Sequence, residues 1–127
     1  MARPGRRAEV LICEDYAPIL RITSRYLERA GYGVSIAEQP EEALRQARRL
    51  EQLELLLVDF DLPGMRGNEL ARQIEELHPG VAVVLMSGHL RDVRGIGELG
   101  RGWLALRKPF TSAQLLEAVD AVLGSRA

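Results

Sequence analysis

The sequence contains 127 residues, of which 17 are basic, 18 are acidic and 46% are hydrophobic, and its net charge is −1. This length suits one domain with its own hydrophobic core rather than two domains. The balanced charge, without a basic stripe interleaved with aromatic residues, argues against direct nucleic-acid binding. No apolar run is long enough for membrane insertion.

The single cysteine, Cys13, lies inside an apolar run and has no second cysteine with which to form a disulfide. It is typical of a small core residue in a reducing compartment. The N-terminal segment 1–7 carries three arginines, but too few apolar residues follow it for a signal peptide. We therefore expect a cytoplasmic protein in which a flexible segment, residues 1–7, precedes one domain at residues 8–125.

Five short apolar runs predict the strands of a sheet. The first, third and fourth are continuously apolar, which is typical of strands buried on both faces of a parallel sheet. The second and fifth alternate in part with polar residues, as expected of edge strands. The five runs are residues 10–13, 34–37, 55–58, 81–86 and 103–107.

Helical patterns connect these runs. Pro18 and Pro40 suit the first turns of two helices, and a third helix follows the turn at Pro63 and Gly64. The segment 89–102 contains glycines that each lower helix propensity by about 1 kcal/mol relative to alanine. The helix predicted there is therefore short or mobile.

The last helix begins with a capping box, because Thr111 is followed three residues later by Gln114. Five strand and helix units in succession predict an α/β fold, namely a flavodoxin-like (βα)5 doubly wound parallel sheet with strand order 2-1-3-4-5. Right-handed crossovers then bring the C-terminal ends of all strands to one edge of the sheet.

Polar residues follow four of the predicted strands at this edge. Like-charged carboxylates about 5 Å apart repel each other by about 3 kcal/mol at an effective dielectric constant near 20, so such a cluster needs a cation. Oxygen ligands without a set of Cys and His residues favour Mg²⁺. The residues are Glu14, Asp15, Asp59, Asp61, Ser87 and Lys108.

Lys108 is the only lysine, since the other sixteen of the 17 basic residues are arginine. This exception indicates a site that requires a compact ammonium rather than a planar guanidinium. An ammonium, a hydroxyl and a divalent cation at one edge suit a group with several negative oxygens. The chemistry that they indicate is phosphoryl transfer.

In their order and spacing these residues resemble the receiver domain of two-component response regulators, over essentially the whole chain. The resemblance implies a signalling phosphoacceptor in a phosphorelay, which catalyses only its own phosphorylation and dephosphorylation and is otherwise not an enzyme. It rests on Glu14-Asp15, Asp59 with Pro63-Gly64, Ser87-Gly88 and Lys108-Pro109-Phe110.

The resemblance also assigns roles to individual residues. It implies that Asp59 accepts a phosphoryl group from a sensor histidine kinase or a phosphotransfer protein, and that Lys108 and Ser87 contact that group. It further implies that Asp15, Asp59 and the backbone carbonyl of Asp61 hold Mg²⁺, with Glu14 assisting. The resulting conformational change would alter binding of an output partner.

Other positions bear on signal output and lifetime. The family's switch pairs the hydroxyl with an aromatic residue three positions before the lysine, and that position is Ala105 here, with Trp103 offset by two. The aromatic half of the switch is therefore absent. Asp61 and His89, two residues after the acceptor and the hydroxyl, are expected to tune the lifetime of the phosphoryl group.

Two other functions stay open at this point. A degenerate receiver would act as a phosphorylation-independent interaction module, for which Ala105 and the glycine-rich segment are the reasons. A haloacid-dehalogenase-type phosphatase also forms an aspartyl phosphate, but its Asp-x-Asp motif lies near the chain start, whereas Asp59 is central. A simpler alternative is that Glu14 and Asp15 are helix caps with no further role.

The sequence identifies neither the kinase, the pathway nor the output partner. The chain is expected to be either a stand-alone regulator or the receiver of a longer protein such as a hybrid kinase. A homodimer is expected to use the helix within residues 89–102, the strand 103–107 and the last helix.

Overall fold

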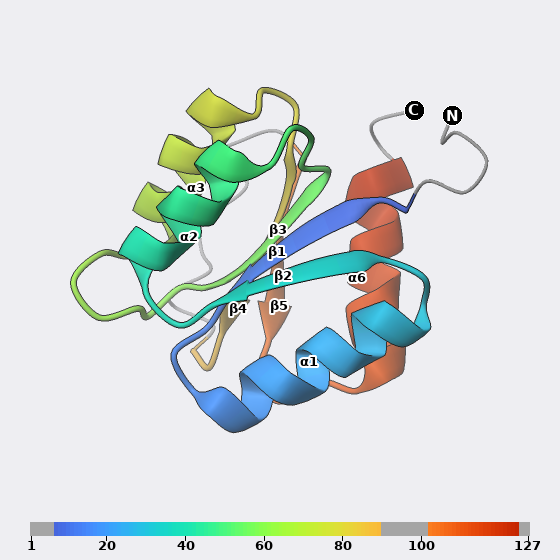
Figure 1. The fold of residues 1–127 in the computed structure, drawn as a ribbon. Coiled ribbons are helices and arrows are strands. Elements are labelled where there is room, and N and C mark those ends of the chain that lie inside the picture. Colours follow the sequence, from blue (N-terminus) through green and yellow to red (C-terminus); the bar gives the residue numbers. More distant parts are fainter. Residues whose placement is uncertain (1–6, 90–101, 125–127) are drawn as a thin grey trace.

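The strands of the chain form one parallel sheet in the order β2-β1-β3-β4-β5 (Figure 1). The computed structural model describes residues 7–89 and 102–124. The predicted fold class and strand order are confirmed. The described elements are β1 (Glu9–Cys13), α1 (Ala17–Arg29), β2 (Gly33–Ala37), α2 (Pro40–Arg49), β3 (Leu55–Asp59), α3 (Gly67–Leu77), β4 (Ala82–Ser87), β5 (Trp103–Arg107) and α6 (Ser112–Gly124).

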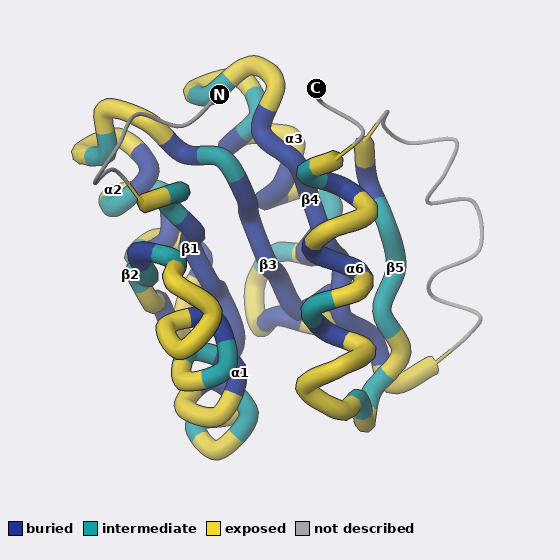
Figure 2. Tube along the Cα trace, turned by 90° about the vertical axis from the view of Figure 1, so that its right-hand side faces the viewer, coloured by how far each residue is buried: buried dark blue, intermediate teal, exposed yellow. Residues whose placement is uncertain are grey.

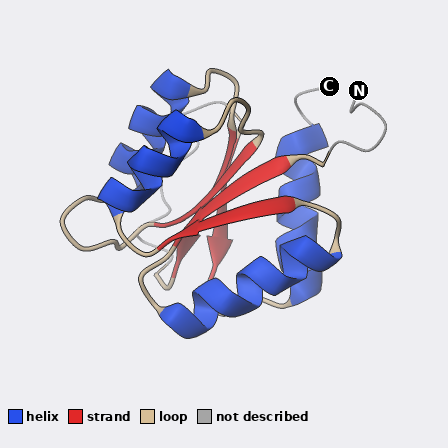
Figure 3. Ribbon diagram, viewed as in Figure 1, coloured by secondary structure: helices blue, strands red, loops and turns tan. Residues whose placement is uncertain are grey.

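Helices cover both faces of the sheet. α2 and α3 lie against one face, and α1 and α6 lie against the other (Figures 1 and 3). Side chains alternate between the two cores along each strand, as in β1, where Leu11 and Cys13 face α2 and α3 while Val10 and Ile12 face α1 and α6. The apolar runs read from the sequence therefore supply two cores at once.

The central strand β3 is the most enclosed part of this arrangement. Every residue from Leu55 to Asp59 is buried, and the burial extends along the neighbouring strands β1 and β4 (Figure 2). Each leucine side chain buried there contributes roughly 1.5–3 kcal/mol relative to exposure. β3 therefore holds its C-terminal residue, Asp59, on a rigid support.

The predicted strand at residues 81–86 is displaced by one residue, because β4 is Ala82–Ser87. The N–H of Val81 donates to His78 in a turn, whereas the carbonyl of Ser87 accepts a hydrogen bond from the N–H of Lys108 at 2.7 Å. The hydrogen bonds of the sheet thus extend to Ser87, at the C-terminal ends of the strands.

Two predictions stay untested by the described residues. The helix within residues 89–102 lies almost wholly outside the described residues, and the domain bounds of 8–125 stay a prediction. Among residues 7–89 and 102–124, no helix combines the length and the apolar character needed to cross a membrane.

The capping box that opens α6 is confirmed. The N–H of Gln114 donates to Oγ1 of Thr111 at 3.1 Å, and the N–H of Thr111 donates to Oε1 of Gln114 at 2.9 Å. Two backbone donors at the start of α6 are satisfied reciprocally. The capping box thereby fixes the start of α6 shortly after Lys108 and Pro109 in the chain.

We predict that Thr111→Ala lowers the free energy of unfolding by about 1 kcal/mol, because one of these donors loses its acceptor. Ser112→Ala removes a hydroxyl from the next, exposed residue and is the matched control, with an expected change within about 0.5 kcal/mol. Urea unfolding followed by circular dichroism measures both. Equal losses in the two variants would show that the box does not stabilise α6.

Candidate functional site

Glu14 and Asp15 lie directly after β1, and the two side chains differ sharply in exposure. Glu14 is fully buried, and its N–H continues the sheet by donating to Ala37 at 3.0 Å. Its Oε2 accepts a hydrogen bond from the N–H of Tyr16 at 3.1 Å, whereas Asp15 is exposed. Glu14 thus points into the protein and Asp15 toward solvent.

Asp59 ends β3 and is only 6% exposed. Its Oδ1 accepts a hydrogen bond from the N–H of Asp61 at 3.2 Å. Beyond Asp59 the chain stays attached to the sheet, because the N–H of Phe60 donates to Met86 at 2.8 Å. The nucleophile that the sequence predicts is therefore held by backbone on both sides.

Lys108 brings the acids of two strands together. Its Nζ lies 2.5 Å from Oε1 of Glu14 and 3.3 Å from Oδ1 of Asp59, and its side chain is 17% exposed. The peptide bond between Lys108 and Pro109 is cis. One ammonium thus bridges the ends of β1 and β3 from a position just after β5.

The pKa of Glu14 shows how enclosed this cluster is. Burial raises the pKa of Glu14 from 4.5 to about 7, although the hydrogen bond from Lys108 acts in the opposite direction. Burial likewise raises the pKa of the Cys13 thiol, to about 12, with nearby acids adding to the effect. Cys13 is accordingly a neutral core residue, as predicted.

The acid cluster fits a divalent cation. One carboxylate oxygen from each of Glu14, Asp15 and Asp59 lies within 4.8 Å of the others. Carboxylates this close together could share one small divalent cation. The donors are hard oxygen ligands without sulfur or imidazole, which is the chemistry that Mg²⁺ prefers.

Ser87 is buried at the end of β4, the strand that pairs with β3. Its hydroxyl donates to the carbonyl of His89 and accepts from the N–H of His89, both at 3.1 Å. His89 itself is exposed. Asp59 pairs with Met86, so Ser87 lies one residue beyond the position opposite Asp59. The tuning role of His89 stays a prediction.

The switch position Ala105 is half-buried and packs with the core formed under α2 and α3. Trp103 lies on the same side of β5 and is 8% exposed. The indole N–H of Trp103 donates to Oε2 of Glu75 on α3 at 3.2 Å. This hydrogen bond ties Trp103 to α3, and the absence of an aromatic switch residue at Ala105 stays a prediction.

Two residues that the sequence did not single out shape the site. The first is Gly67, the first residue of α3, whose N–H donates to Phe60 at 2.9 Å. A Cβ atom on Gly67 would overlap the backbone carbonyl of Asp59. The motif Pro63-Gly64 predicts a turn, but only the structure shows that the chain returns against the backbone of Asp59 at Gly67.

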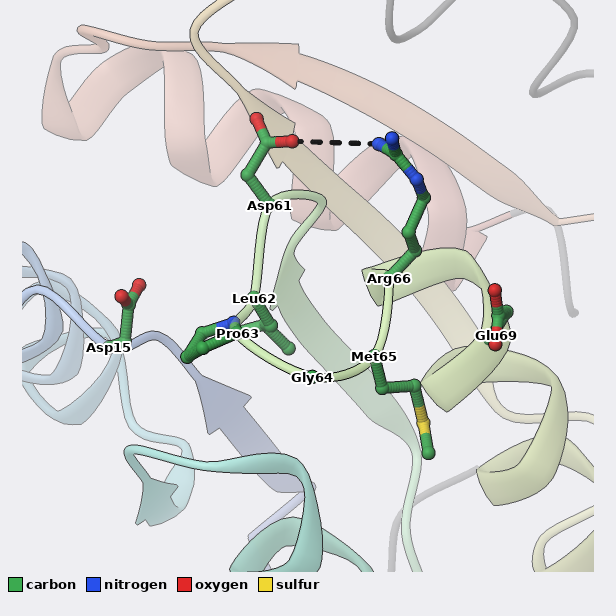
Figure 4. Close-up of a pocket in the computed structure, with 8 residues that line it drawn as sticks. All are labelled: Asp15, Asp61, Leu62, Pro63, Gly64, Met65, Arg66 and Glu69. Atoms are coloured by element: carbon green, nitrogen blue, oxygen red, sulfur yellow. Dashed lines mark ion pairs between the residues drawn. The ribbon is translucent and has the colours of Figure 1, made fainter.

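The second is Arg66, which lines a pocket of about 510 Å³ beside the acid cluster (Figure 4). Its Nη1 lies 3.7 Å from Oδ1 of Asp61. Arginines occur throughout the sequence, so composition gave no reason to select this one. The complete lining is Asp15, Asp61, Leu62, Pro63, Gly64, Met65, Arg66 and Glu69.

The fold and this site define an α/β protein that gathers acids, an amine and a hydroxyl at the C-terminal ends of parallel strands. The chain belongs to the response regulator receiver domain family, whose sequence model matches residues 10–120. The two-component receiver domain expected from the residues is thereby confirmed.

Curated relatives support the same assignment. Response regulator receiver protein CpdR from Brucella abortus is 29% identical over 115 residues, which cover 90% of this chain and 95% of CpdR. Transcriptional regulatory protein ResD from Bacillus subtilis is 33% identical over 118 residues, which cover 91% of this chain and 48% of ResD. The chain spans only 26% of transcriptional regulatory protein GlrR from Escherichia coli.

Solved structures agree in fold over nearly the full length. A CheY-like receiver domain protein from Methanospirillum hungatei has a TM-score of 0.83 and 30% identity, and the match covers 95% of this chain and 97% of that one. A receiver protein from Sinorhizobium medicae has a TM-score of 0.85 and 26% identity, covering 96% and 98%.

We predict that, in metal-free buffer, the stability of the wild type relative to Glu14→Gln falls as the pH rises from about 4.5 to about 7. The folded state binds the Glu14 proton more tightly than the unfolded chain, so ionisation favours unfolding. Urea unfolding of both proteins across this pH range measures the difference. A difference that does not change with pH would contradict the raised pKa.

We predict that Gly67→Ala lowers the free energy of unfolding by about 1–3 kcal/mol, because the added methyl group forces α3 away from Asp59. Gly124→Ala is the matched control, since a Cβ atom there meets no atom within 4 Å. Urea unfolding compares the two variants. Equal stability of Gly67→Ala and the wild type would show that the close approach is unimportant.

Proposed function

We propose that Asp59 accepts a phosphoryl group from a phosphohistidine of a sensor kinase or phosphotransfer protein, and that the resulting change alters the binding of an output partner. The observation that carries this proposal is the position of Nζ of Lys108, 3.3 Å from Oδ1 of Asp59 and 2.5 Å from Oε1 of Glu14. A nucleophile, a cation and further acids thus meet at one point.

Asp59 is suited to attack because its carboxylate is already oriented. In the transfer, a bond forms between its oxygen and phosphorus while the bond from phosphorus to the donor's imidazole nitrogen breaks, leaving an aspartyl phosphate and a free histidine. The departing imidazole takes its proton from solvent. The N–H of Asp61, which donates to Oδ1 of Asp59 at 3.2 Å, limits rotation of the carboxylate.

During transfer, the ammonium of Lys108 would move its contact from Asp59 to the phosphoryl group. Its ammonium can keep its hydrogen bond to Glu14 while it donates to a phosphoryl oxygen. Ser87, whose hydroxyl donates to His89, can redirect that hydrogen bond to a second phosphoryl oxygen. Such donors stabilise charge where it develops in the transition state.

Mg²⁺ would be held by Asp15, Asp59 and the carbonyl of Asp61, with Glu14 assisting, and would supply positive charge to the phosphoryl oxygens. The clustered carboxylate oxygens of Glu14, Asp15 and Asp59 support this assignment. Asp15 is the exposed member of the cluster and is therefore open to solvent.

The chain acts in this proposal as a signalling phosphoacceptor and not as an enzyme with a separate substrate. We place it in the cytoplasm, with which the buried free thiol of Cys13 agrees. Output, including a homodimer, would use β5, α6 and the adjoining segment outside the described residues. His89 and Asp61 would set the lifetime of the phosphoryl group.

A second candidate is a degenerate receiver that binds partners without phosphorylation. The observation that favours it is Ala105, which leaves β5 without the family's aromatic switch residue while Trp103 is bonded to Glu75. The acid cluster and its lysine favour the phosphoacceptor. Membership of the receiver family argues against a haloacid-dehalogenase-type phosphatase.

Intact mass spectrometry after incubation with acetyl phosphate tests the proposal. We expect the mass of one phosphoryl group on the wild type with Mg²⁺, and none with a chelator or in Asp59→Asn. Peptide mapping should place the group on Asp59. An unmodified wild type would support the degenerate receiver, and steady hydrolysis of unrelated phosphate monoesters would support a phosphatase.

We predict that Lys108→Ala slows this phosphorylation by about 100-fold or more, because the transition state loses a donor in an enclosed site. Lys108→Arg should not restore the rate, since a planar guanidinium does not fit the position of a compact ammonium. Single-turnover kinetics by mass spectrometry give both rates. Full activity in Lys108→Arg would show that any cation suffices.

A further inference from the structure

The pocket beside the nucleophile has an unusual charge balance. Three acids line it, Asp15, Asp61 and Glu69, and Arg66 is the only cation among its described lining residues. Asp15 and Asp61 both lie next to Asp59, and a phosphoryl donor is itself anionic, so these acids repel it unless a cation offsets them. In Figure 4 the side chains of Arg66 and Asp61 point toward each other across the loop between β3 and α3.

Arg66 is restrained in this position from three directions. Its carbonyl accepts hydrogen bonds from the N–H groups of Glu69 and Leu70 at the start of α3, at 3.0 and 3.1 Å. Its guanidinium carbon lies 5.4 Å from the centre of the Phe60 ring, within the range of a cation–π contact. Its Nη1 lies 3.7 Å from Oδ1 of Asp61.

Asp61 connects Arg66 to the nucleophile. Its N–H donates to Oδ1 of Asp59 at 3.2 Å, so Asp61 lies directly beside the carboxylate that would attack. The Debye length at physiological salt is about 8 Å, so a charge this close acts on a donor that approaches Asp59. An Asp61 carboxylate without its cation would therefore oppose phosphorylation.

We propose that Arg66 is a positioning residue for phosphoryl transfer, which holds the Asp61 carboxylate to one side, neutralises it and so admits anionic donors to Asp59. This inference rests on the proposed function, because it concerns the rate at which Asp59 is phosphorylated. The pair itself is exposed, with the side chains of Arg66 and Asp61 62% and 50% accessible. Arg66 therefore acts on the rate rather than on the stability of the fold.

The expected effect of Arg66→Ala is a decrease of about two- to fivefold in the second-order rate constant for acetyl phosphate, the range of an exposed ion pair. The decrease should appear mainly in the apparent KM for the donor, with the maximal rate little changed. It should shrink as salt is raised, because salt screens exposed charges. Arg66→Lys should retain most of the wild-type rate.

The decisive variant is the double substitution of Arg66→Ala with Asp61→Asn. Removal of the unpaired carboxylate should restore at least half of the rate that Arg66→Ala loses. Arg29→Ala is the matched control, because it removes the same charge from an exposed arginine at the far end of α1. α1 has 13 residues and so spans about 20 Å.

The experiment measures initial phosphorylation rates of the wild type and these variants at low and high salt, with thermal melting of each as a check on folding. A salt-dependent loss in Arg66→Ala that Asp61→Asn repairs supports the proposal. Wild-type rates in Arg66→Ala, or a loss that Asp61→Asn leaves unchanged, overturn it while leaving Asp59 as the acceptor. A wild type that takes up no phosphoryl group overturns both proposals.

Discussion

The ion pairs made by Lys108 are the interaction on which the site depends. A fully buried carboxylate such as Glu14 is costly to ionise unless a partner compensates it, and removal of one partner from a buried pair commonly costs several kcal/mol. Lys108 lies 2.5 Å from Glu14 and 3.3 Å from Asp59, so it compensates acids from two strands. The ammonium therefore allows Glu14 and Asp59, which come from different strands, to lie close together despite their like charges.

The sheet supplies the precision that this arrangement needs. β1 pairs with β3, β3 pairs with β4, and β4 pairs with β5, so the strands that carry Glu14, Asp59, Ser87 and Lys108 end side by side. Their apolar residues are buried between two layers of helices, which fixes the register. Reactive groups on loops gain from such a rigid support. Gly67 completes it, because the first turn of α3 closes directly on Asp59.

Much of this could be predicted from the sequence, for definite physical reasons. Continuous apolar runs identify buried parallel strands, and the two partly polar runs indicate the edge strands, which favours the order 2-1-3-4-5. The same order places Glu14, Asp59 and Lys108 at one edge without knowledge of any side-chain position. The capping box of Thr111 and Gln114 is local and therefore equally readable.

The rest depends on contacts between residues far apart or on side-chain direction. Nothing in the sequence shows that Glu14 turns inward while Asp15 turns outward, since both follow the same strand. The overlap of Gly67 with Asp59 depends on the path of the loop. The contact of Arg66 with Asp61 depends on a rotamer, and a chain rich in arginine gives no hint of it.

Acids that follow two strands meet a lysine that follows a third, and the proposed function requires these acids to hold one divalent cation beside Asp59. A crystal of the protein grown with Mn²⁺ in place of Mg²⁺, with its anomalous scattering mapped, tests this claim most directly. We expect one strong peak within bonding distance of carboxylate oxygens of Asp15 and Asp59, with Lys108 still in contact with Glu14. A peak elsewhere, or none at a saturating concentration of Mn²⁺, would contradict it.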